Sequence, residues 1–314
     1  MNAPARESEA RPIDDLGPAG RFSSAWKRDE PLARHTSMRV GGPADLFCEV
    51  ASDEELGAWI AWGRERAMPV FLLGGGTNLI VGDRGIRGLV LKLGRRFVRT
   101  EWTIEGDDAR VVVGAAANFK RVVLDTLERG FTGLEFGEGI PGTIGGGVIM
   151  NAGAFGGEIG EVVEAICGVD ANGNPSRLPR EALHFSYRHL ALPAGFVVTA
   201  LEVHLRRGDR EEIQARAAEA RRRRGLRQPL GQPNAGSIWK NPPGDFAGRL
   251  IEQVGLQGEQ VGGAQISPRH ANFIVNTGSA TAADIRALMD LTRDRVWAAR
   301  GVWLEPEVRL VGEW

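Results

Sequence analysis

The stretch LLGGGTNLIV, at residues 72–81, places three consecutive glycines between two apolar runs. An apolar run that enters a glycine loop is a common way of presenting backbone N–H groups to a phosphate. The stretch does not fit the two best-known phosphate-binding motifs. A dinucleotide fingerprint that starts at Gly74 needs glycine at position 79, which is Leu79, and a P-loop needs Gly-Lys-Ser or Gly-Lys-Thr, which is absent.

The residues before and after this loop have the pattern of a βαβ unit. Residues 44–50 alternate loosely and predict a strand, and SDEE at 52–55 is typical of a capping box at the start of a helix. Residues 70–73 predict a second strand, which ends at the three glycines, and residues 89–93 predict a third. We therefore expect a small first domain with a glycine loop at the carboxyl end of a strand, where open α/β sheets bind ligands.

A second glycine-rich loop lies in the long uncharged segment between Glu138 and Glu158. Because so many glycines make a poor helix in lipid, the segment predicts loops and not a membrane span. The surrounding residues, 100–205, predict strands with one clear helix at 118–129. This pattern indicates an α+β middle domain.

The last third of the chain predicts a third domain. A charged helix at 209–224 leads into residues 225–233, whose prolines and glycines exclude regular structure. Further on, Thr281 and Asp284 form the capping box of another predicted helix. Residues 302–310 alternate between apolar and polar side chains and predict a final strand.

Composition limits the partners of this chain of 314 residues. The formal net charge of -1 gives no general attraction to nucleic acid or to an anionic membrane, and we expect neither as a partner. The two cysteines, Cys48 and Cys167, form no CxxC pair, and the five histidines have no metal-ligand spacing, so the sequence predicts no disulfide framework and no metal site. The polar first residues lack the apolar core of a secretory signal, which predicts a cytoplasmic protein.

Four segments occur in the order and spacing of one known family. They are LGGGTN at 73–78, IPGTIGG at 140–146 with NAGAFG at 151–156, NAGSIWKNP at 234–242, and LEPEV at 304–308. Each segment alone is a weak signal, but four in order form a specific one. From about residue 35 to residue 312 the chain resembles the flavin-dependent UDP-N-acetylenolpyruvoylglucosamine reductases, in the compact type that lacks an inserted tyrosine-bearing loop.

The resemblance implies an α+β protein with the two-subdomain FAD-binding fold of the vanillyl-alcohol-oxidase type and an α/β substrate-binding domain. The implied parts are a flexible tail at 1–28, FAD-binding subdomains at 29–94 and 95–206, and a substrate-binding domain at 207–314 whose C-terminal strand carries the catalytic glutamate. In this family the two glycine loops hold the FAD diphosphate between them, which explains the missing dinucleotide fingerprint. The implied cofactor-binding residues are Gly74, Gly75, Gly76, Thr77, Asn78, Pro141, Gly142, Gly145, Gly146, Asn151 and Gly153.

The implied reaction is the NADPH-dependent, FAD-mediated reduction of UDP-N-acetylglucosamine enolpyruvate to UDP-N-acetylmuramate in peptidoglycan precursor synthesis. FAD is then the cofactor, NADPH the hydride donor and a nucleotide sugar the small-molecule substrate. Such a reaction needs a group that stabilises an enolate-like charge and a group that supplies a proton. Two other functions stay open: an FAD-dependent oxidase or dehydrogenase of a sugar or hydroxy acid on the same fold, and a non-catalytic flavin or nucleotide-sugar-binding protein.

Three residues match the catalytic positions of the family. Arg188, in the segment FSYRHL, can grip a carboxylate in two places, although a lone Tyr-Arg is more often part of a surface ion pair. The family continues Tyr-Arg-x-Ser, and here Leu190 replaces that serine. Ser237 matches the proton donor, and its alternative is a turn or cap serine. Glu307 matches the acidic residue of the family, which strand parity alone cannot distinguish from Glu305.

Four further residues are implied in substrate binding. They are Tyr187, Arg227, Lys240 and Asn241. The arginines of the basic run at 221–227 are usually just a solvated helix face. This run leads into the serine motif, however, and is placed to meet the diphosphate of a nucleotide sugar.

Overall fold

The computed structural model describes residues 25–314. Most of the predicted tail at 1–28 therefore lies outside the described residues. Residues 26–28 belong to β1 (Trp26–Pro31), which pairs with β2 (Pro43–Val50). Regular structure thus begins before the predicted end of the tail.

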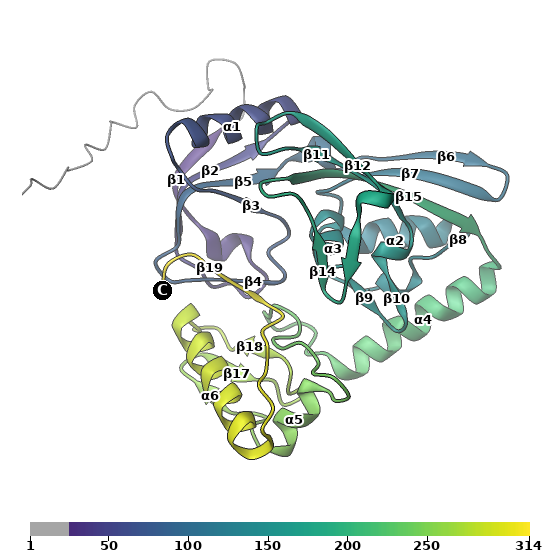
Figure 1. The fold of residues 1–314 in the computed structure, drawn as a ribbon. Coiled ribbons are helices and arrows are strands. Elements are labelled where there is room, and N and C mark those ends of the chain that lie inside the picture. The colour runs from purple at the N-terminus through teal and green to yellow at the C-terminus, as the bar shows by residue number, and fades with distance from the viewer. Residues whose placement is uncertain (1–24) are drawn as a thin grey trace, which may run out of the picture.

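The first sheet has four strands in the order β1-β2-β5-β3 (Figure 1). β2, β3 (Val70–Leu73) and β5 (Ile86–Leu93) run parallel, and β1 is antiparallel to β2. α1 (Asp53–Glu65) connects β2 to β3, and the side chain of its N-cap residue Ser52 accepts a hydrogen bond from the backbone N–H three residues later. The predicted βαβ unit is confirmed, and the first glycine loop follows the carboxyl end of β3.

The second sheet has six antiparallel strands, in the order β12-β11-β15-β7-β6 with β8 beside β15. These are β6 (Thr100–Glu105), β7 (Asp108–Gly114), β8 (Phe131–Thr132), β11 (Val163–Val169), β12 (Pro175–Pro179) and β15 (Val197–Arg207). α2 (Phe119–Glu128) and α3 (Ile144–Ile149) pack against this sheet around a core that includes Phe119 and Phe131. Two short hairpins complete this part, β9 (Gly153–Ala154) with β10 (Gly157–Glu158) and β13 (His184–Ser186) with β14 (His189–Ala191).

Helices dominate the last part of the chain, drawn from green to yellow in Figure 1. α4 (Arg210–Arg227) leads into it, and α5 (Ala247–Gln253) and α6 (Ala282–Arg300) accompany a three-stranded sheet of β16 (Gln260–Val261), β17 (Ala264–Ile266) and β18 (Ile274–Asn276). The predicted capping box at the start of α6 is confirmed.

α4 is longer than the sequence predicts, because it continues through Gly225. One glycine weakens a helix by only about 1 kcal/mol. Pro229 instead disfavours helical backbone at the residue before it, and α4 ends at Arg227, with the extended residue Gln228 as its C-cap. The stop signal is therefore the proline and not the glycine.

The C-terminal segment returns to the first part of the chain. β19 (Arg309–Val311) pairs in parallel with β4 (Leu79–Val81), which directly follows the first glycine loop. The predicted strand at 302–310 is wrong for most of its length, because its alternation comes from an extended segment that buries Leu304 and Val308 and pairs only through an isolated bridge between Pro306 and Trp239. Glu307 therefore precedes the strand on which it was expected.

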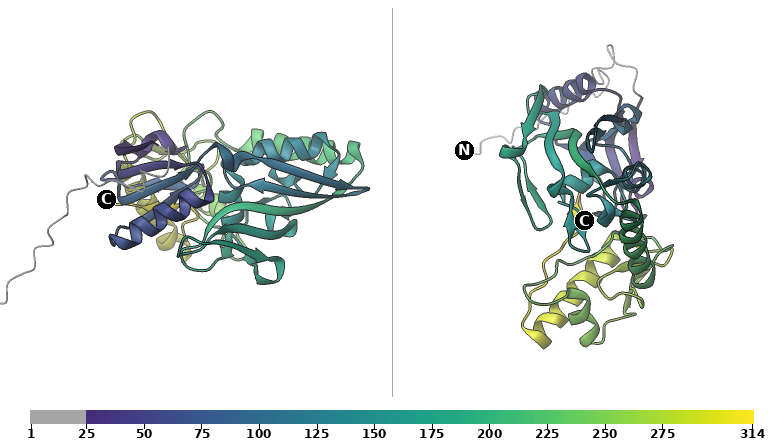
Figure 2. Two further views of the ribbon diagram at one scale, coloured as in Figure 1. Left: turned by 90° about the horizontal axis from the view of Figure 1, so that it is seen from above. Right: turned by 90° about the vertical axis from the view of Figure 1, so that its right-hand side faces the viewer.

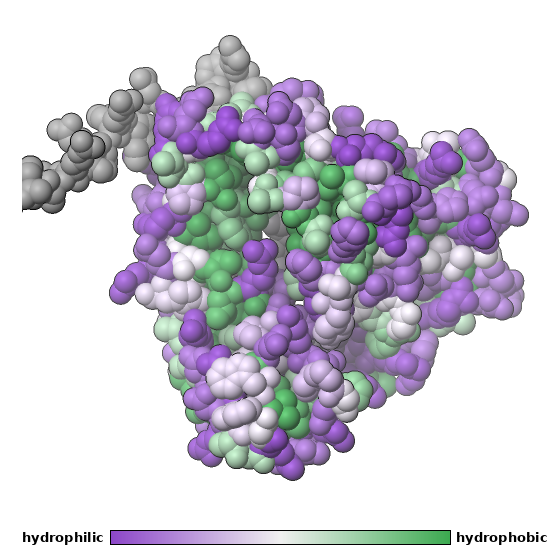
Figure 3. Space-filling view, in the orientation of Figure 1, coloured by the Kyte–Doolittle hydropathy of each residue, from purple (hydrophilic) through white to green (hydrophobic). Residues whose placement is uncertain are grey.

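Figure 2 shows the last part of the chain packed beneath the two sheets in a second view. One buried cluster joins Met38, Val40 and Ile80 to the helices of the last part of the chain. The segment before β2 and the strand after the first glycine loop therefore share a hydrophobic core with the last part of the chain. The exact domain boundaries stay predictions. On the face drawn in Figure 3, hydrophilic side chains cover most of the surface, and hydrophobic ones show over the first sheet below α1. Among residues 25–314, no helix combines the length and the apolar character needed to cross a bilayer.

Candidate active site

A cavity of about 970 Å³ lies where the three parts of the chain meet. Both glycine loops, the C-terminal end of α4, the serine motif and the segment before β19 form its wall. All three predicted catalytic residues, Arg188, Ser237 and Glu307, line it. The fold thus brings to one place residues from three distant segments.

The two glycine loops touch on one wall of this cavity. A Cβ atom on Gly75 would lie 2.8 Å from the Gly142 Cα, and one on Gly76 would lie 2.0 Å from the His35 carbonyl oxygen, so both positions require glycine. Within residues 25–314, the backbone N–H groups of Gly75, Gly76 and Thr77 donate to no protein acceptor. Unpaired N–H groups beside a cavity suit the oxygens of a diphosphate, so the loops fit the predicted FAD.

Most of the other predicted cofactor residues also line the cavity. These are Gly74, Thr77, Asn78, Pro141, Gly145, Gly146 and Gly153. Asn78 has a second contact, because its side-chain amide donates to the Glu307 carbonyl oxygen at 3.1 Å and so fixes the C-terminal segment. Gly142 does not line the cavity but allows the two loops to touch. Asn151 is fully buried and does not line it either, so its side-chain contacts lie within the protein, and its role toward the cofactor stays a prediction.

Arg188 lies in the turn of the β13–β14 hairpin. Its backbone φ is +58°, in the left-handed region that residues other than glycine rarely adopt. Its Nε donates to Glu307 Oε1 at 2.8 Å, and its Nη1 donates to the Gly153 carbonyl oxygen at 3.2 Å. Burial raises the pKa of Glu307, and the charge of Arg188 acts in the opposite direction. The pair holds a cation at the cavity wall, as the predicted carboxylate grip requires.

Ser237 follows a turn built by Asn234 and Gly236. The Asn234 side-chain oxygen accepts a hydrogen bond from the Gly236 N–H at 3.0 Å, and Gly236 has a φ of +78°. In the described part of the chain the Ser237 hydroxyl has no hydrogen-bond partner, and the residue lines the cavity. The next residue, Ile238, accepts the Glu307 N–H at 2.8 Å, so the two segments that carry the predicted proton donor and the predicted acid lie side by side.

Two of the predicted substrate residues lie at or near the cavity. Arg227, at the end of α4, lines it. Tyr187 does not line it and is 52% exposed, but the Arg188 guanidinium lies 5.1 Å from the centre of its ring. Tyr187 therefore contacts the predicted catalytic arginine and not the cavity itself.

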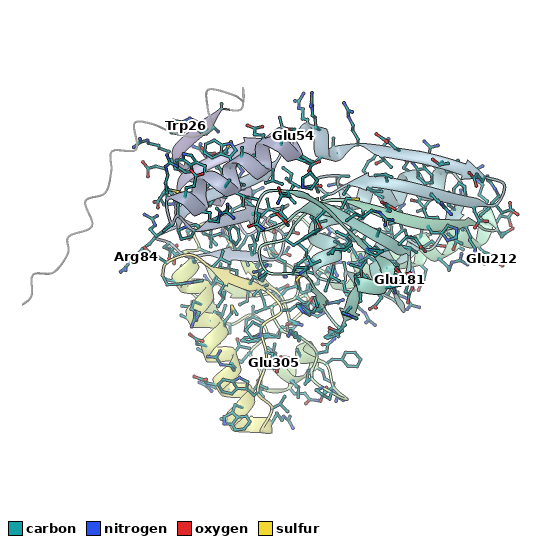
Figure 4. All side chains as sticks on the ribbon, turned by 45° about the horizontal axis from the view of Figure 1, so that its top comes forward. Trp26, Glu54, Arg84, Glu181, Glu212 and Glu305 are labelled. Carbon is teal, nitrogen blue, oxygen red and sulfur yellow. The ribbon has the colours of Figure 1, made fainter. Side chains whose placement is uncertain are left out.

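The other two predicted substrate residues do not line the cavity. Lys240 Nζ lies 3.4 Å from an oxygen of Glu305, whose side chain is labelled in Figure 4 on the C-terminal segment. Glu305 is thus the ion-pair partner of Lys240. The Asn241 side-chain oxygen accepts the Ala247 N–H at the start of α5. The structure gives both residues contacts within the protein.

Two polar residues of the cavity wall, Arg224 and Ser37, were not among the site residues that the sequence predicts individually. Arg224 lines the cavity, its Nε has no partner within residues 25–314, and burial together with the charge of Arg188 lowers its pKa. A signal was available, because Arg224 and Arg227 share a helix face in the basic run. Ser37 also lines the cavity, and its hydroxyl lies 2.6 Å from the Asn234 carbonyl oxygen. No local motif marks Ser37.

Comparison with known proteins decides the family. An FAD binding domain model matches residues 44–178, and a model of the UDP-N-acetylenolpyruvoylglucosamine reductase C-terminal domain matches residues 228–311. The UDP-N-acetylenolpyruvoylglucosamine reductase 2 of Symbiobacterium thermophilum is 46% identical over 91% of this chain and 92% of its own length. The chain belongs to the UDP-N-acetylenolpyruvoylglucosamine reductase family.

Other members of the reductase family agree with this assignment. The relative from Heliobacterium modesticaldum is 43% identical over 93% of this chain and 92% of its own length. The crystal structure of the UDP-N-acetylenolpyruvylglucosamine reductase from Thermus caldophilus covers 92% of this chain and 98% of its own, with 36% identity and a TM-score of 0.77. The predicted α+β fold, the FAD cofactor and the oxidoreductase class are confirmed for this reductase family member. Residues 25–314 contain no group of three or more His, Cys, Asp or Glu side chains that could hold a metal ion.

Proposed function

We propose that this protein catalyses the NADPH-dependent, FAD-mediated reduction of UDP-N-acetylglucosamine enolpyruvate to UDP-N-acetylmuramate, a cytoplasmic step of peptidoglycan precursor synthesis. The observation that carries the proposal is the ion pair of Arg188 and Glu307 on the wall of the cavity that Ser237 and both glycine loops also line. A carboxylate-binding cation, a hydroxyl and diphosphate-binding loops are the groups that this reaction needs. The names of the curated relatives support the same substrate class.

The reaction adds a hydride and a proton across the enolpyruvyl double bond. When bound, FAD supplies the hydride chemistry, taking a hydride from NADPH and passing it to the terminal alkene carbon. The adjacent carbon, which carries the carboxylate, takes the proton, and the double bond becomes the single bond of a lactyl ether. The chain must therefore hold the carboxylate, stabilise the charge that develops on it and deliver one proton.

Arg188 is the residue that we assign to the substrate carboxylate. Glu307 holds its Nε at 2.8 Å and Gly153 holds its Nη1 at 3.2 Å, which leaves further N–H donors of the guanidinium for a ligand. A cation fixed in this way needs little reorganisation when an enolate-like charge develops. In this assignment Glu307 orients the guanidinium.

Ser237 is the residue that we assign to proton delivery. A serine hydroxyl is a weak acid, so it needs positive charge nearby to release its proton. Arg188 and Arg224 line the same cavity and supply that charge. We assign Arg224 together with Arg227 to the diphosphate of the nucleotide sugar, because two guanidinium groups on one helix end suit phosphate oxygens.

An anaerobic stopped-flow experiment on Ser237→Ala tests these roles. We expect the variant to accept hydride from NADPH at the wild-type rate, while reoxidation by UDP-N-acetylglucosamine enolpyruvate slows by about 100- to 10,000-fold. Ser279→Ala, at an exposed serine, is the matched control and should change neither rate. If the substrate reoxidises the flavin of Ser237→Ala at the wild-type rate, the proton-donor role is contradicted. Rapid flavin reduction by a sugar or hydroxy acid, and not by NADPH, would favour an oxidase or dehydrogenase.

A further inference from the structure

Asn151 is fully buried and does not line the cavity, although its neighbours Ala152 and Gly153 do. Both ends of its side-chain amide are used, because Nδ2 donates to the Ser186 carbonyl oxygen and Oδ1 accepts the Gly160 N–H, each at 3.1 Å. Its backbone φ is +38°, in the left-handed region that asparagine tolerates better than most residues. A buried amide bonded at both ends joins two segments of the protein and is not available to a ligand.

The carbonyl group that Asn151 binds belongs to the hairpin that carries Arg188. Ser186 pairs with His189 across this hairpin, so the turn between them consists of two residues and contains Arg188. In the described part of the chain, Asn151 is the one side chain that hydrogen-bonds to the backbone of residues 184–191. Because Arg188 has a φ of +58°, the turn is strained, and a strained turn keeps its geometry only where its surroundings hold it.

The loop that contains Asn151 also supplies the second contact of the Arg188 side chain. Gly153, two residues further on, accepts the hydrogen bond from Arg188 Nη1 at 3.2 Å. Asn151 therefore fixes the hairpin against the same loop that receives the guanidinium. On the return strand, Leu190 is 3% exposed and packs in the core, so packing and not a serine hydroxyl holds that side of the hairpin.

We infer that Asn151 is a positioning residue for Arg188, whose amide sets the hairpin so that the guanidinium reaches Glu307 and the substrate carboxylate. The inference rests on the proposed function, in which Arg188 binds that carboxylate. The position needs a donor, an acceptor and a left-handed backbone together. Aspartate would keep the acceptor but place an oxygen against the Ser186 carbonyl, and alanine would lose both bonds.

Kinetics of the FAD-loaded full chain test this role. We expect Asn151→Ala to bind FAD and to accept hydride from NADPH as the wild type does, because neither step uses Arg188. Reoxidation by UDP-N-acetylglucosamine enolpyruvate should slow by about 10- to 100-fold, with a raised KM, because the guanidinium is misplaced. In an Arg188→Ala background the same change should slow reoxidation by less than about twofold, because the contact that it serves is already lost.

Two controls separate positioning from a general loss of stability. Val123→Ala truncates a fully buried side chain of the same core and should lower the melting temperature without changing the reoxidation rate. Hydrogen exchange of residues 184–191 should become faster in Asn151→Ala and stay unchanged in Val123→Ala. If Asn151→Ala does not fold, Asn151→Gly tests the same loss of bonds, because glycine tolerates the positive φ.

Three results would overturn the inference. The first is a variant that loses FAD but, once loaded, reoxidises at the wild-type rate, which would make Asn151 a cofactor residue. The second is an Asn151→Ala change that slows reoxidation by the same factor in the Arg188→Ala background as in the wild type. The third is unchanged hydrogen exchange of residues 184–191 in Asn151→Ala. A wild-type protein that NADPH reduces but the substrate does not reoxidise would overturn the proposed function instead, and the exchange result would stand independently of it.

Discussion

Replacing Arg188 by alanine and by glycine separates the stabilisation from its side-chain hydrogen bonds from the backbone strain at its positive φ. The side chain bonds to Glu307 at 2.8 Å and to Gly153 at 3.2 Å, while the backbone is held at a φ of +58°. The Arg188 and Glu307 side chains are 24% and 15% exposed, so we take the lost pair to cost about 2 kcal/mol, near the lower end for hydrogen bonds to charged groups. Both variants should lose most of the reoxidation by substrate.

Arg188→Gly should nevertheless be more stable than Arg188→Ala. A residue with a Cβ in the left-handed region is destabilised by about 1–2 kcal/mol, and glycine avoids this strain. Glycine also increases the freedom of the unfolded chain, which offsets about 0.4–1 kcal/mol of the gain. With mid-range values, the free energy of unfolding of Arg188→Gly exceeds that of Arg188→Ala by about 0.8 kcal/mol.

Urea unfolding followed by circular dichroism measures this difference as a shift in midpoint at constant slope. Tyr187 is the matched control, because it precedes Arg188 in the same turn and is not among the residues with a positive φ. Tyr187→Gly should therefore be less stable than Tyr187→Ala. A midpoint for Arg188→Gly at or below that of Arg188→Ala would show that the turn carries no strain, and the argument would fail.

Three further predictions concern other parts of the structure. Asn272→Ala should destabilise the fold by about 2–4 kcal/mol in urea unfolding, because it leaves the buried N–H and C=O groups of Trp239 without the partners that they have at 2.9 and 2.8 Å. Burial raises the pKa of Glu307, so the folded state holds a proton there that the unfolded state releases at lower pH. The wild type should therefore lose stability relative to Glu307→Gln as the pH rises through that raised pKa, which unfolding midpoints followed from about pH 4 to about pH 8 can check. Burial raises the pKa of Cys48 to about 12 and also raises that of Cys167, so both thiols should react slowly with iodoacetamide until urea unfolds the chain, as mass spectrometry would show.

Local signals in the sequence predict much of the fold. Ser52 and Thr281 cap α1 and α6 as expected, because a cap depends on residues three or four positions away. Asn118, where the sequence predicts a helix to begin, is the N-cap of α2. The strand expected at 302–310 is an extended segment for most of its length. Its alternation reflects burial on one side, and a sequence pattern does not reveal whether a partner strand lies alongside.

Most of the predicted site residues line the cavity, but the sequence does not predict their contacts. Asn78 and Asn151 both stand in motifs that the sequence assigns to the cofactor, yet their amides bond to carbonyl groups of residues 229 and 35 positions away, at Glu307 and Ser186. A motif identifies the loop, whereas the direction of each side chain depends on segments that meet only in the folded chain. The basic run that contains Arg224 and Arg227 was found, and their shared helix face could have identified Arg224 individually, because the signal is local.

The most direct test of the central claim is an anaerobic titration of the purified wild-type protein. After reconstitution with FAD, the flavin is reduced with NADPH, the excess is removed, and UDP-N-acetylglucosamine enolpyruvate is added while the visible flavin band is followed. We predict that the band bleaches with NADPH and returns with the substrate. A band that stays bleached after the substrate is added would contradict the proposed reaction.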